Sequence, residues 1–376
     1  MCTAVSFVTK DHYFGRNLDY EFSYEESVVI TPRKYTFSFR NEMVNKYVAG
    51  MKSEGIREEC EDNHYAMIGV AYVVDNYPLY YDAVNEKGLG MAGLLFAGNA
   101  VYFSMEKEGI PVYCSRRSLE TGEEKCSIYV ASYEFIPWIL RRCHDVESAV
   151  SLLKRIRITD QEFSKELPPS PLHWMLADEK RTIVVEAVEE GLKIYENPVH
   201  VLTNNPTFDY HLTNLSNYTA LSAYEPDEFF CDVIKLPVHS RGMGGMGLPG
   251  DLSSSSRFVR AAFTRINSIC GESEEESVSQ FFHILGSVEQ QRGCVRLTKQ
   301  KKGCESLENQ EETEEKYEIT IYSGCCNASK GIYYYKTYNN FNIETVDMRK
   351  SDLSGNELVI FPMKTEWDTE KKNKDY

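Results

Sequence analysis

Apolar positions at the start of the chain predict two adjoining β-strands. Residues 2–9 and 12–18 are rich in β-branched and aromatic residues, and only a short polar turn separates them. Apolar side chains fall on both faces of the first strand, as is typical of a strand covered on two sides. In an antiparallel hairpin the chain returns beside its own start. We therefore expect residues 16–19 to lie next to Cys2, within one residue of register.

Three further segments show the pattern of strands. Residues 173–196 predict a meander of three strands, with polar turns near residues 179 and 190. Residues 199–206 predict another strand, which ends in the sequence "NNP". Residues 331–348 predict a late hairpin with a second pair of asparagines near its turn. Strands therefore occupy both ends and the middle of the chain.

Apolar residues at helical spacing indicate three helices. They recur over residues 145–156 behind Asp145, a candidate N-cap, over residues 255–269 behind a serine run, and over residues 277–288. The resulting order is strands, helix, strands, helices and strands, without the regular alternation of a βαβ fold. This order predicts an α+β protein in which helices lie outside antiparallel sheets.

Composition narrows the classes of partner. The chain has 376 residues, of which 41 are basic and 57 acidic, and its formal net charge is −16. This balance disfavours nucleic acid and anionic membranes, whose phosphates need clustered positive charge. The sequence has no apolar run near the roughly 20 residues that span a bilayer. It also shows no secretory signal, so we expect a cytoplasmic protein.

Patterns for disulfides, cofactors and metals are weak. The eleven cysteines are an odd, scattered set, which we expect to stay reduced in the cytosol. The glycine run at residues 242–247 matches a dinucleotide pattern, but no strand precedes it closely and Pro249 follows where a helix should begin. His173 lies in a predicted strand and is interpreted as a core residue, because the eight histidines show no metal-ligand spacing. We therefore expect neither a cofactor nor a metal.

The position of Cys2 next to the start of the chain suggests that it could act as an N-terminal nucleophile. Removal of Met1 by an aminopeptidase would give Cys2 both a thiol and a free α-amine. That amine has a reference pKa of about 8, close to the pH at which a general base works well. An N-terminal nucleophile therefore needs no separate histidine. Arg16 would favour the thiolate and Asp19 would orient the amine, but a surface ion pair explains these two residues equally well.

Longer stretches resemble the choloylglycine hydrolase family, which contains bile salt hydrolases and penicillin V acylases. The likeness begins with "MCTAV" and "FGRNLDY" and covers nearly the whole chain. The other matching stretches, in order, are "YPLYYDAVNEKGLGMAGLLF" (77–96), "LHWMLAD" (172–178), "VLTNNPTFDYHLTNL" (201–215), "GLPGDLSSSSRF" (247–258) and "GIYYYKTYNN" (331–340). The resemblance implies one N-terminal-nucleophile hydrolase domain over residues 1–376, an αββα sandwich of four layers.

The resemblance implies an active site when each of the family's active-site residues is matched to a position in this sequence. The family's nucleophile falls on Cys2, and its active-site arginine and aspartate fall on Arg16 and Asp19. Its oxyanion-hole asparagine falls on Asn204, and its second arginine on Arg257. The implied reaction is attack of the Cys2 thiolate on an amide carbonyl, while Asn204 donates to the oxyanion. The α-amine then protonates the leaving amine, and water cleaves the thioester.

Leu95 departs from the family pattern, because bile salt hydrolases usually have asparagine there and penicillin V acylases often have tyrosine. Its backbone N–H still completes the implied oxyanion hole, but the side-chain clue to the substrate is lost. We expect a glycine- or taurine-conjugated bile acid as the substrate. The alternative is penicillin V or another N-acyl amide, with acyl transfer to an amino acid as a further outcome. Leu18, Leu95 and Phe163 are expected to line the acyl pocket.

The resemblance also bears on assembly and on two polar segments. Members of the family often form tetramers, which implies a homo-oligomer. Residues 299–316 are a charged, low-complexity stretch that predicts a flexible loop, and residues 366–376 predict a polar tail. A non-catalytic binding protein with the same fold would need a broken site, whereas all five carried-over residues are present.

Overall fold

Two large antiparallel sheets form the centre of the computed structural model, which describes residues 1–42, 64–105, 128–227, 229–297, 315–369 and 372. The first sheet has the strand order β12-β1-β2-β16-β17-β18, with β15 paired to β16. Its strands are β12 (Val201–Leu202), β1 (Cys2–Val8), β2 (His12–Tyr20), β16 (Tyr317–Asn327), β17 (Ile332–Thr337), β18 (Glu344–Asp347) and β15 (Val295–Arg296). The chain therefore begins in the interior of a sheet.

The second sheet has eight strands in the order β11-β10-β9-β6-β5-β4-β3-β19. Its strands are β11 (Gly191–Glu196), β10 (Thr182–Val188), β9 (Leu172–Ala177), β6 (Gly90–Leu95), β5 (Tyr77–Asn85), β4 (Met67–Val74), β3 (Ser27–Thr31) and β19 (Val359–Pro362). A parallel pair, β7 (Ile128–Ala131) and β8 (Ile156–Thr159), and a small hairpin, β13 (Phe229–Cys231) with β14 (Ile234–Lys235), lie outside both sheets.

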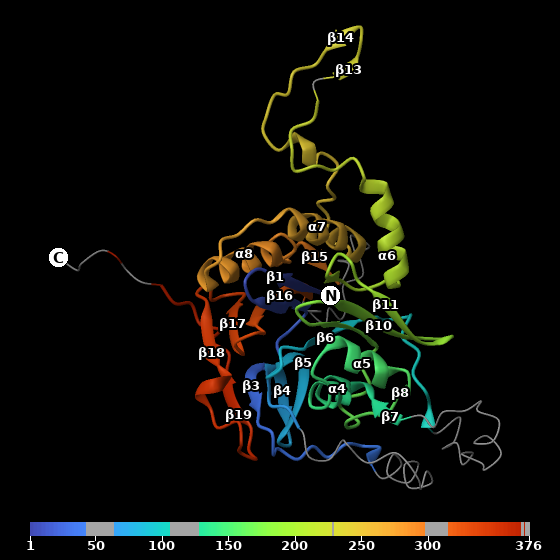
Figure 1. Ribbon diagram of the computed structural model, residues 1–376, viewed down its shortest axis with the longest axis vertical. Coiled ribbons are helices and arrows are strands. Elements are labelled where there is room, and N and C mark those ends of the chain that lie inside the picture. Colours follow the sequence, from blue (N-terminus) through green and yellow to red (C-terminus); the bar gives the residue numbers. More distant parts are fainter. Residues whose placement is uncertain (43–63, 106–127, 228, 298–314, 370–371, 373–376) are drawn as a thin grey trace, which may run out of the picture.

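Helices cover the outer faces of the two sheets. Helices α7 (Ser254–Asn267) and α8 (Glu274–Gly286) contact β1, and α8 also contacts β2 and β16. On the far side, α4 (Phe135–Leu140) contacts β5 and β6 and lies beside α5 (Val146–Leu153) (Figure 1). The remaining α-helix of the described residues is α6 (Phe208–Asn214). This layering is the αββα sandwich that the resemblance implies.

Most of the predicted elements are confirmed. The N-terminal hairpin pairs Cys2 with Leu18, which settles the register. The predicted meander is β9, β10 and β11, and the late hairpin is β17 and β18. Asp145 caps α5 by accepting a hydrogen bond from the backbone N–H of Ser148. The glycine run lies in the loop between β14 and α7.

Several predicted boundaries differ from the structure, and two of these differences have a clear local cause. The strand expected over residues 199–206 is only Val201–Leu202, because His200 has a positive φ of 56° that breaks the extended backbone before it. Helix α8 starts at Glu274, three residues before the predicted start at Ser277. Its start is fixed by a capping box in which Ser273 and Glu276 bond each other's backbone N–H groups. Residues 299–314 of the predicted loop, and 370–371 and 373–376 of the predicted tail, lie outside the described residues.

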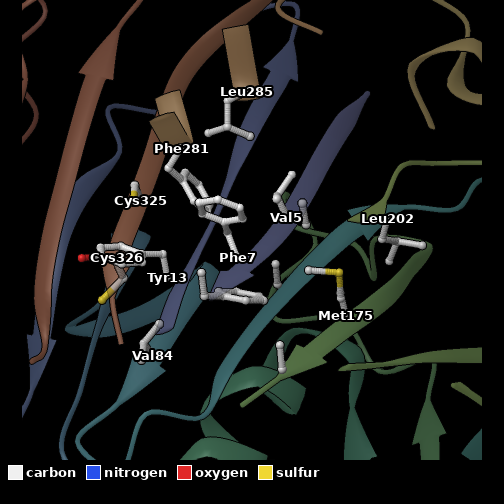
Figure 2. Close-up of a cluster of buried hydrophobic side chains, with 14 of the residues drawn as sticks. Val5, Phe7, Tyr13, Val84, Met175, Leu202, Phe281, Leu285, Cys325 and Cys326 are labelled. Atoms are coloured by element: carbon white, nitrogen blue, oxygen red, sulfur yellow. The ribbon is translucent and has the colours of Figure 1, made fainter. Parts of the chain in front are cut away.

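A hydrophobic core holds α8 against the first sheet. Figure 2 shows Phe281 and Leu285 reaching from α8 toward Phe7 of β1, and Met175 of β9 belongs to the same cluster. Phe281 and Leu285 have no exposed surface. Burial of a large apolar side chain contributes about 1.5–3 kcal/mol, so this cluster fixes the strand on which the chain begins. None of the described helices is both long and apolar enough to cross a bilayer.

Truncation of Phe281 should destabilise the fold strongly. Because the Phe281→Ala variant leaves a cavity between α8 and β1, we expect it to lower the free energy of unfolding by about 3–5 kcal/mol. Urea unfolding followed by circular dichroism measures the loss. Ile266→Ala, on the exposed side of α7, is the matched control and should change this free energy by less than about 0.5 kcal/mol. Equal, small losses in both variants would contradict the importance of this contact.

Candidate active site

The N-terminal hairpin sets the positions of the first three predicted residues. Cys2 opens β1 opposite Leu18 of β2, and its side chain is a free, buried thiol. Side chains alternate between the faces of a strand, so Arg16 and Leu18 share the face of Cys2, which looks toward the second sheet. Asp19 points to the opposite face, toward the helix layer. The hairpin therefore brings all three residues to one end of the sheet, as predicted.

Asn204 follows β12 and contacts the start of the chain. Its side-chain Oδ1 accepts a hydrogen bond from the backbone N–H of Cys2 at 2.7 Å, and its Nδ2 donates to the carbonyl oxygen of Leu95 at 2.8 Å. The backbone of Asn204 is held as well: its N–H donates to Ser254 Oγ, and its carbonyl oxygen lies 2.8 Å from His211 Nε2. Asn204 thus bridges β1 and the end of β6.

Arg257 lies in the first turns of α7, and its side chain has no exposed surface. One terminal nitrogen donates to the carbonyl oxygen of Cys2 at 2.6 Å and to Thr3 Oγ1 at 2.7 Å. The other donates to Asn204 Oδ1 at 2.8 Å. A guanidinium only donates hydrogen bonds, so it requires the oxygen of the Asn204 amide on its own side. The nitrogen of that amide therefore faces Leu95.

Asp19 is the buried anion beside this guanidinium. Its Oδ2 lies 3.8 Å from a terminal nitrogen of Arg257, and its Oδ1 accepts a hydrogen bond from Thr320 at 2.6 Å. Burial raises the pKa of Asp19 above its ordinary value, although Arg257 and the chain terminus act in the opposite direction. The backbone oxygen of Asp19 accepts a hydrogen bond from the α-amine of Met1 at 2.7 Å. That amine also pairs with Glu318, and burial lowers its pKa.

Arg16 connects the first sheet to the second. One of its terminal nitrogens donates to the backbone oxygens of Tyr81 at 2.9 Å and Gly93 at 2.5 Å. Burial alone would lower the pKa of Arg16, but the acidic groups around it, with Cys2 first among them and Asp82 nearby, raise the pKa above its ordinary value. Arg16 therefore stays a cation next to the thiol.

A mainly apolar and aromatic pocket opens beside Cys2. The three residues predicted to line an acyl pocket, Leu18, Leu95 and Phe163, all line it. Cys2, Arg16 and Asp19 line it as well. Sequence patterns do not single out the remaining lining residues, among which are Met1, Tyr20, Tyr24, Glu26, Tyr72, Leu79, Tyr81, Tyr133, Leu167 and Leu172. The spaced aromatic residues of "YEFSY" (20–24) are the one signal that could have indicated an aromatic wall.

No group of three or more histidine, cysteine, aspartate or glutamate side chains among the described residues is placed to hold a metal ion. His173 is a buried core residue, as interpreted from the sequence. Its Nε2 lies 2.8 Å from the carbonyl oxygen of Thr203, and its Nδ1 lies 3.1 Å from a carboxylate oxygen of Glu186. The histidine therefore supports the loop that carries Asn204.

Comparisons with known proteins agree over nearly the whole length. Residues 2–361 match the family model of linear amide C–N hydrolases, choloylglycine hydrolase family. The chain is 47% identical to a bile salt hydrolase/transferase of Lactiplantibacillus plantarum, covering 97% of this chain and 98% of the relative. It is 38% identical to a bile salt hydrolase/transferase of Clostridium perfringens, covering 96% of each chain.

Solved structures show the same fold. The crystal structure of a mutant conjugated bile acid hydrolase from Clostridium perfringens matches with a TM-score of 0.79 at 34% identity, covering 99% of this chain and 100% of that one. A penicillin V acylase from Agrobacterium tumefaciens matches with a TM-score of 0.62, covering 96% of this chain and 91% of that one. Its identity to this chain is only 17%, so this second likeness concerns the fold alone.

Replacing the buried guanidinium should cost stability in a pH-dependent way. In Arg257→Met, Asp19 loses its nearby cation, so we expect the free energy of unfolding to fall by about 3–5 kcal/mol. Without that cation the pKa of Asp19 rises further. A carboxyl whose pKa is higher in the folded than in the unfolded state binds its proton more tightly in the folded state, so protonation favours folding. This contribution is fully present below the unfolded-state pKa and is lost as the pH rises through the folded-state pKa. The deficit should therefore be larger at about pH 8 than at about pH 5.

Urea unfolding at both pH values measures this difference. Arg241→Met, which removes an exposed arginine ahead of α7, is the control and should show no such pH dependence. Arg257→Lys keeps a positive charge but loses the forked donors, so it should fall between the wild type and Arg257→Met. A deficit of equal size at both pH values would contradict the role of Asp19.

Proposed function

The chain belongs to the choloylglycine hydrolase family of linear amide C–N hydrolases, and we propose that it is a bile salt hydrolase. Its substrates would be bile acids conjugated to glycine or taurine, and the bond cleaved would be the amide. The observation that carries the proposal is an apolar pocket that opens on the Cys2 thiol beside the Asn204 amide. The pocket suits a steroid acyl group, and the similarity to two bile salt hydrolase/transferases supports that choice.

The proposed reaction begins once Met1 has been removed. In the unprocessed chain the nitrogen of Cys2 is an amide that donates to Asn204, and an amide has no basic lone pair. After removal the same nitrogen is an α-amine, which accepts the thiol proton. The cations of Arg16 and Arg257 favour the resulting thiolate. Cys2 would then supply both the nucleophile and the base.

Attack of the Cys2 sulfur on the amide carbonyl forms the carbon–sulfur bond and a tetrahedral oxyanion. The Asn204 Nδ2 has a second hydrogen beyond the one given to Leu95, and this hydrogen would bind the oxyanion together with the backbone N–H of Leu95. Such a donor is typically worth about 3–4 kcal/mol. Arg257 would act indirectly, because it keeps the nitrogen of that amide turned toward the pocket side.

Collapse of the intermediate breaks the carbon–nitrogen bond. The protonated α-amine of Cys2 gives its proton to the leaving glycine or taurine nitrogen, and a thioester remains. Water then attacks the thioester, the α-amine takes a proton from that water, and the free bile acid and the thiol are released. Asp19 would balance the charge of Arg257. An amino acid in place of water would give acyl transfer instead.

A competition assay tests the substrate and the nucleophile together. The purified protein would receive equal amounts of glycocholate, taurocholate and penicillin V, with and without an added amino acid. We expect glycine and taurine to be the main products, and new amide to appear when the amino acid is present. The protein's intact mass should show that Met1 is missing. Cys2→Ala should abolish turnover, whereas Cys294→Ala, at an exposed free thiol, should retain it.

Three outcomes would contradict this assignment. Release of phenoxyacetate in excess of glycine and taurine would identify a penicillin V acylase instead. Turnover by Cys2→Ala would exclude Cys2 as the nucleophile. If the wild type is inactive and its mass shows Met1 retained, digestion with a methionine aminopeptidase before refolding should restore turnover, and continued inactivity would then overturn the proposal.

We also propose that the chain forms a homo-oligomer through the arm around β13 and β14. This arm extends away from the two sheets (Figure 1) and carries strongly exposed apolar side chains. Tyr224 is 84% exposed, Val233 94% and Met246 71%. Exposed apolar groups of this kind mark surfaces that become covered by a partner. A second copy of the chain is the partner that the family resemblance implies.

The arm predicts how assembly should respond to a charge. Val233→Asp puts a carboxylate among the exposed apolar side chains, so we expect it to reduce the oligomer to smaller species in native mass spectrometry. Ile269→Asp is the matched control, because Ile269 is 89% exposed but lies in the loop between α7 and α8. Disruption by the control variant alone, or by neither variant, would contradict assembly through the arm.

We propose a cytoplasmic location as well. The described residues include the free thiols of Cys2, Cys294 and the neighbours Cys325 and Cys326. A reducing compartment keeps such thiols unpaired, and it would also protect the proposed nucleophile from oxidation.

A further inference from the structure

A buried acid between the two sheets has no part in the proposed reaction. Asp82 belongs to β5 of the second sheet and is 1% exposed. Its Oδ1 accepts a hydrogen bond from the hydroxyl of Tyr322 at 2.6 Å, and its Oδ2 accepts one from the hydroxyl of Tyr333 at 2.7 Å. Both tyrosines come from the first sheet, on β16 and β17. The side chain of Asp82 therefore links the two sheets.

Arg16 crosses between the sheets in the opposite direction and at the same place. From β2 of the first sheet it donates to the backbone oxygen of Tyr81, the residue before Asp82 in β5. It also donates to the backbone oxygen of Gly93, which follows Ala92, the residue paired with Asp82 across β5 and β6. A cation from the first sheet and an acid of the second thus approach each other between the sheets.

The strand beside Arg16 carries a glycine that makes room for one of the two hydroxyls. Gly324 of β16 is paired with Arg16 of β2. A Cβ atom at Gly324 would collide with the Tyr333 hydroxyl. A larger residue would therefore push this hydroxyl away from Asp82. The close approach at Gly324 keeps the bond between Tyr333 and Asp82 next to the strand that carries Arg16.

These contacts favour the anionic form of Asp82. Burial raises the pKa of Asp82 above its ordinary value, whereas the Arg16 cation and the two tyrosine hydroxyls act in the opposite direction. Burial first, and the Asp82 charge second, raise the pKa of Tyr322 and of Tyr333 well above their ordinary values, so both remain protonated donors. Each carboxylate oxygen thus accepts an O–H bond, as suits an ionised carboxyl. The Arg16 cation then has two acidic neighbours, Asp82 and the Cys2 thiol.

Other charged and titratable groups also face these two acids. Besides Arg16, those around Cys2 are the α-amine of the chain start, Asp19 of β2 and Arg257 of α7. Those around Asp82, besides Arg16 and its two tyrosine donors, are Tyr80 of its own strand and Cys326 of β16. Burial raises the pKa of Tyr80 and of Cys326 above their ordinary values, so both stay neutral at physiological pH. Arg16 is therefore the group that acts on both acids.

We propose that Asp82 is a positioning residue of the Cys2 site, which balances the charge of Arg16 and so sets the pH range over which the Cys2 thiol ionises. An arginine with a fixed counter-charge stabilises a thiolate less than an unbalanced arginine does. The thiol can then keep its proton until the α-amine of Cys2 removes it. This role rests on the proposed function, in which Cys2 is the nucleophile.

Alkylation of Cys2 at a series of pH values tests this role on the full chain. Iodoacetamide would be the reagent, and peptide mass spectrometry would give the rate at Cys2 alone. Asp82→Asn keeps the size of the side chain and its hydrogen-bonding capacity but loses the charge. The midpoint pH of the Cys2 rate should therefore fall by about one pH unit. Glu190→Gln, which removes an exposed carboxylate in the turn between β10 and β11, is the matched control and should leave this midpoint unchanged.

The exposed free thiol of Cys294 is the internal reference, and its midpoint should be the same in every variant. A Cys2 midpoint that stays constant or rises in Asp82→Asn would overturn the proposal. If Asp82→Asn does not fold, the double variant Tyr322→Phe with Tyr333→Phe takes its place. Without its donors Asp82 should take up a proton, so an unchanged midpoint there would overturn the proposal as well.

Alkylation requires no bile salt, so its result is independent of amide hydrolysis. A chain that cleaves bile salts but has the same Cys2 midpoint with and without the Asp82 charge would keep its proposed function and lose this role of Asp82. A shifted midpoint in a chain that cleaves no bile salt would establish the role of Asp82 and leave the proposed substrate wrong.

Discussion

The buried guanidinium of Arg257 is the interaction on which the start of the chain depends. It bonds the carbonyl oxygen of Cys2, the hydroxyl of Thr3 and the side-chain oxygen of Asn204, and so joins α7, β1 and the loop after β12. Because arginine cannot accept a hydrogen bond, it also decides which way the Asn204 amide points. One side chain therefore fixes both the position of Cys2 and the orientation of the amide beside it.

The two buried arginines of this region have different tasks. Arg257 reaches from the helix layer and is balanced by Asp19, whereas Arg16 crosses toward the second sheet and bonds the backbone oxygens of Tyr81 and Gly93. Both cations come close to Cys2 from different layers. Two buried cations thus lie beside this thiol between the sheets, although the whole chain has a net charge of −16.

The pattern of apolar residues predicts the N-terminal hairpin, and the hairpin in turn places Arg16 and Asp19 close to Cys2. No local pattern predicts that Asn204 and Arg257 contact Cys2, because these contacts join residues more than 200 positions apart. Only the family resemblance indicates these two residues. The pocket wall was missed for a related reason. Tyr24 lies in the connection after β2, and its place in the pocket wall depends in part on packing against Tyr72 of β4, at 5.6 Å between ring centroids. The start of α8, by contrast, was readable in the capping box of Ser273 and Glu276.

The burial of Met1 has a consequence for the order of events during synthesis. In the folded chain its α-amine binds the backbone oxygen of Asp19 and pairs with Glu318, so it is largely covered. Glu318 lies near the far end of the chain, and the other partners of this region, Asn204 and Arg257, also follow long after Cys2. At about 5–20 residues per second, the ribosome takes roughly tens of seconds to supply them. The first peptide bond is therefore more open in the nascent or unfolded chain than in the folded one, where residues from the far end of the sequence cover it.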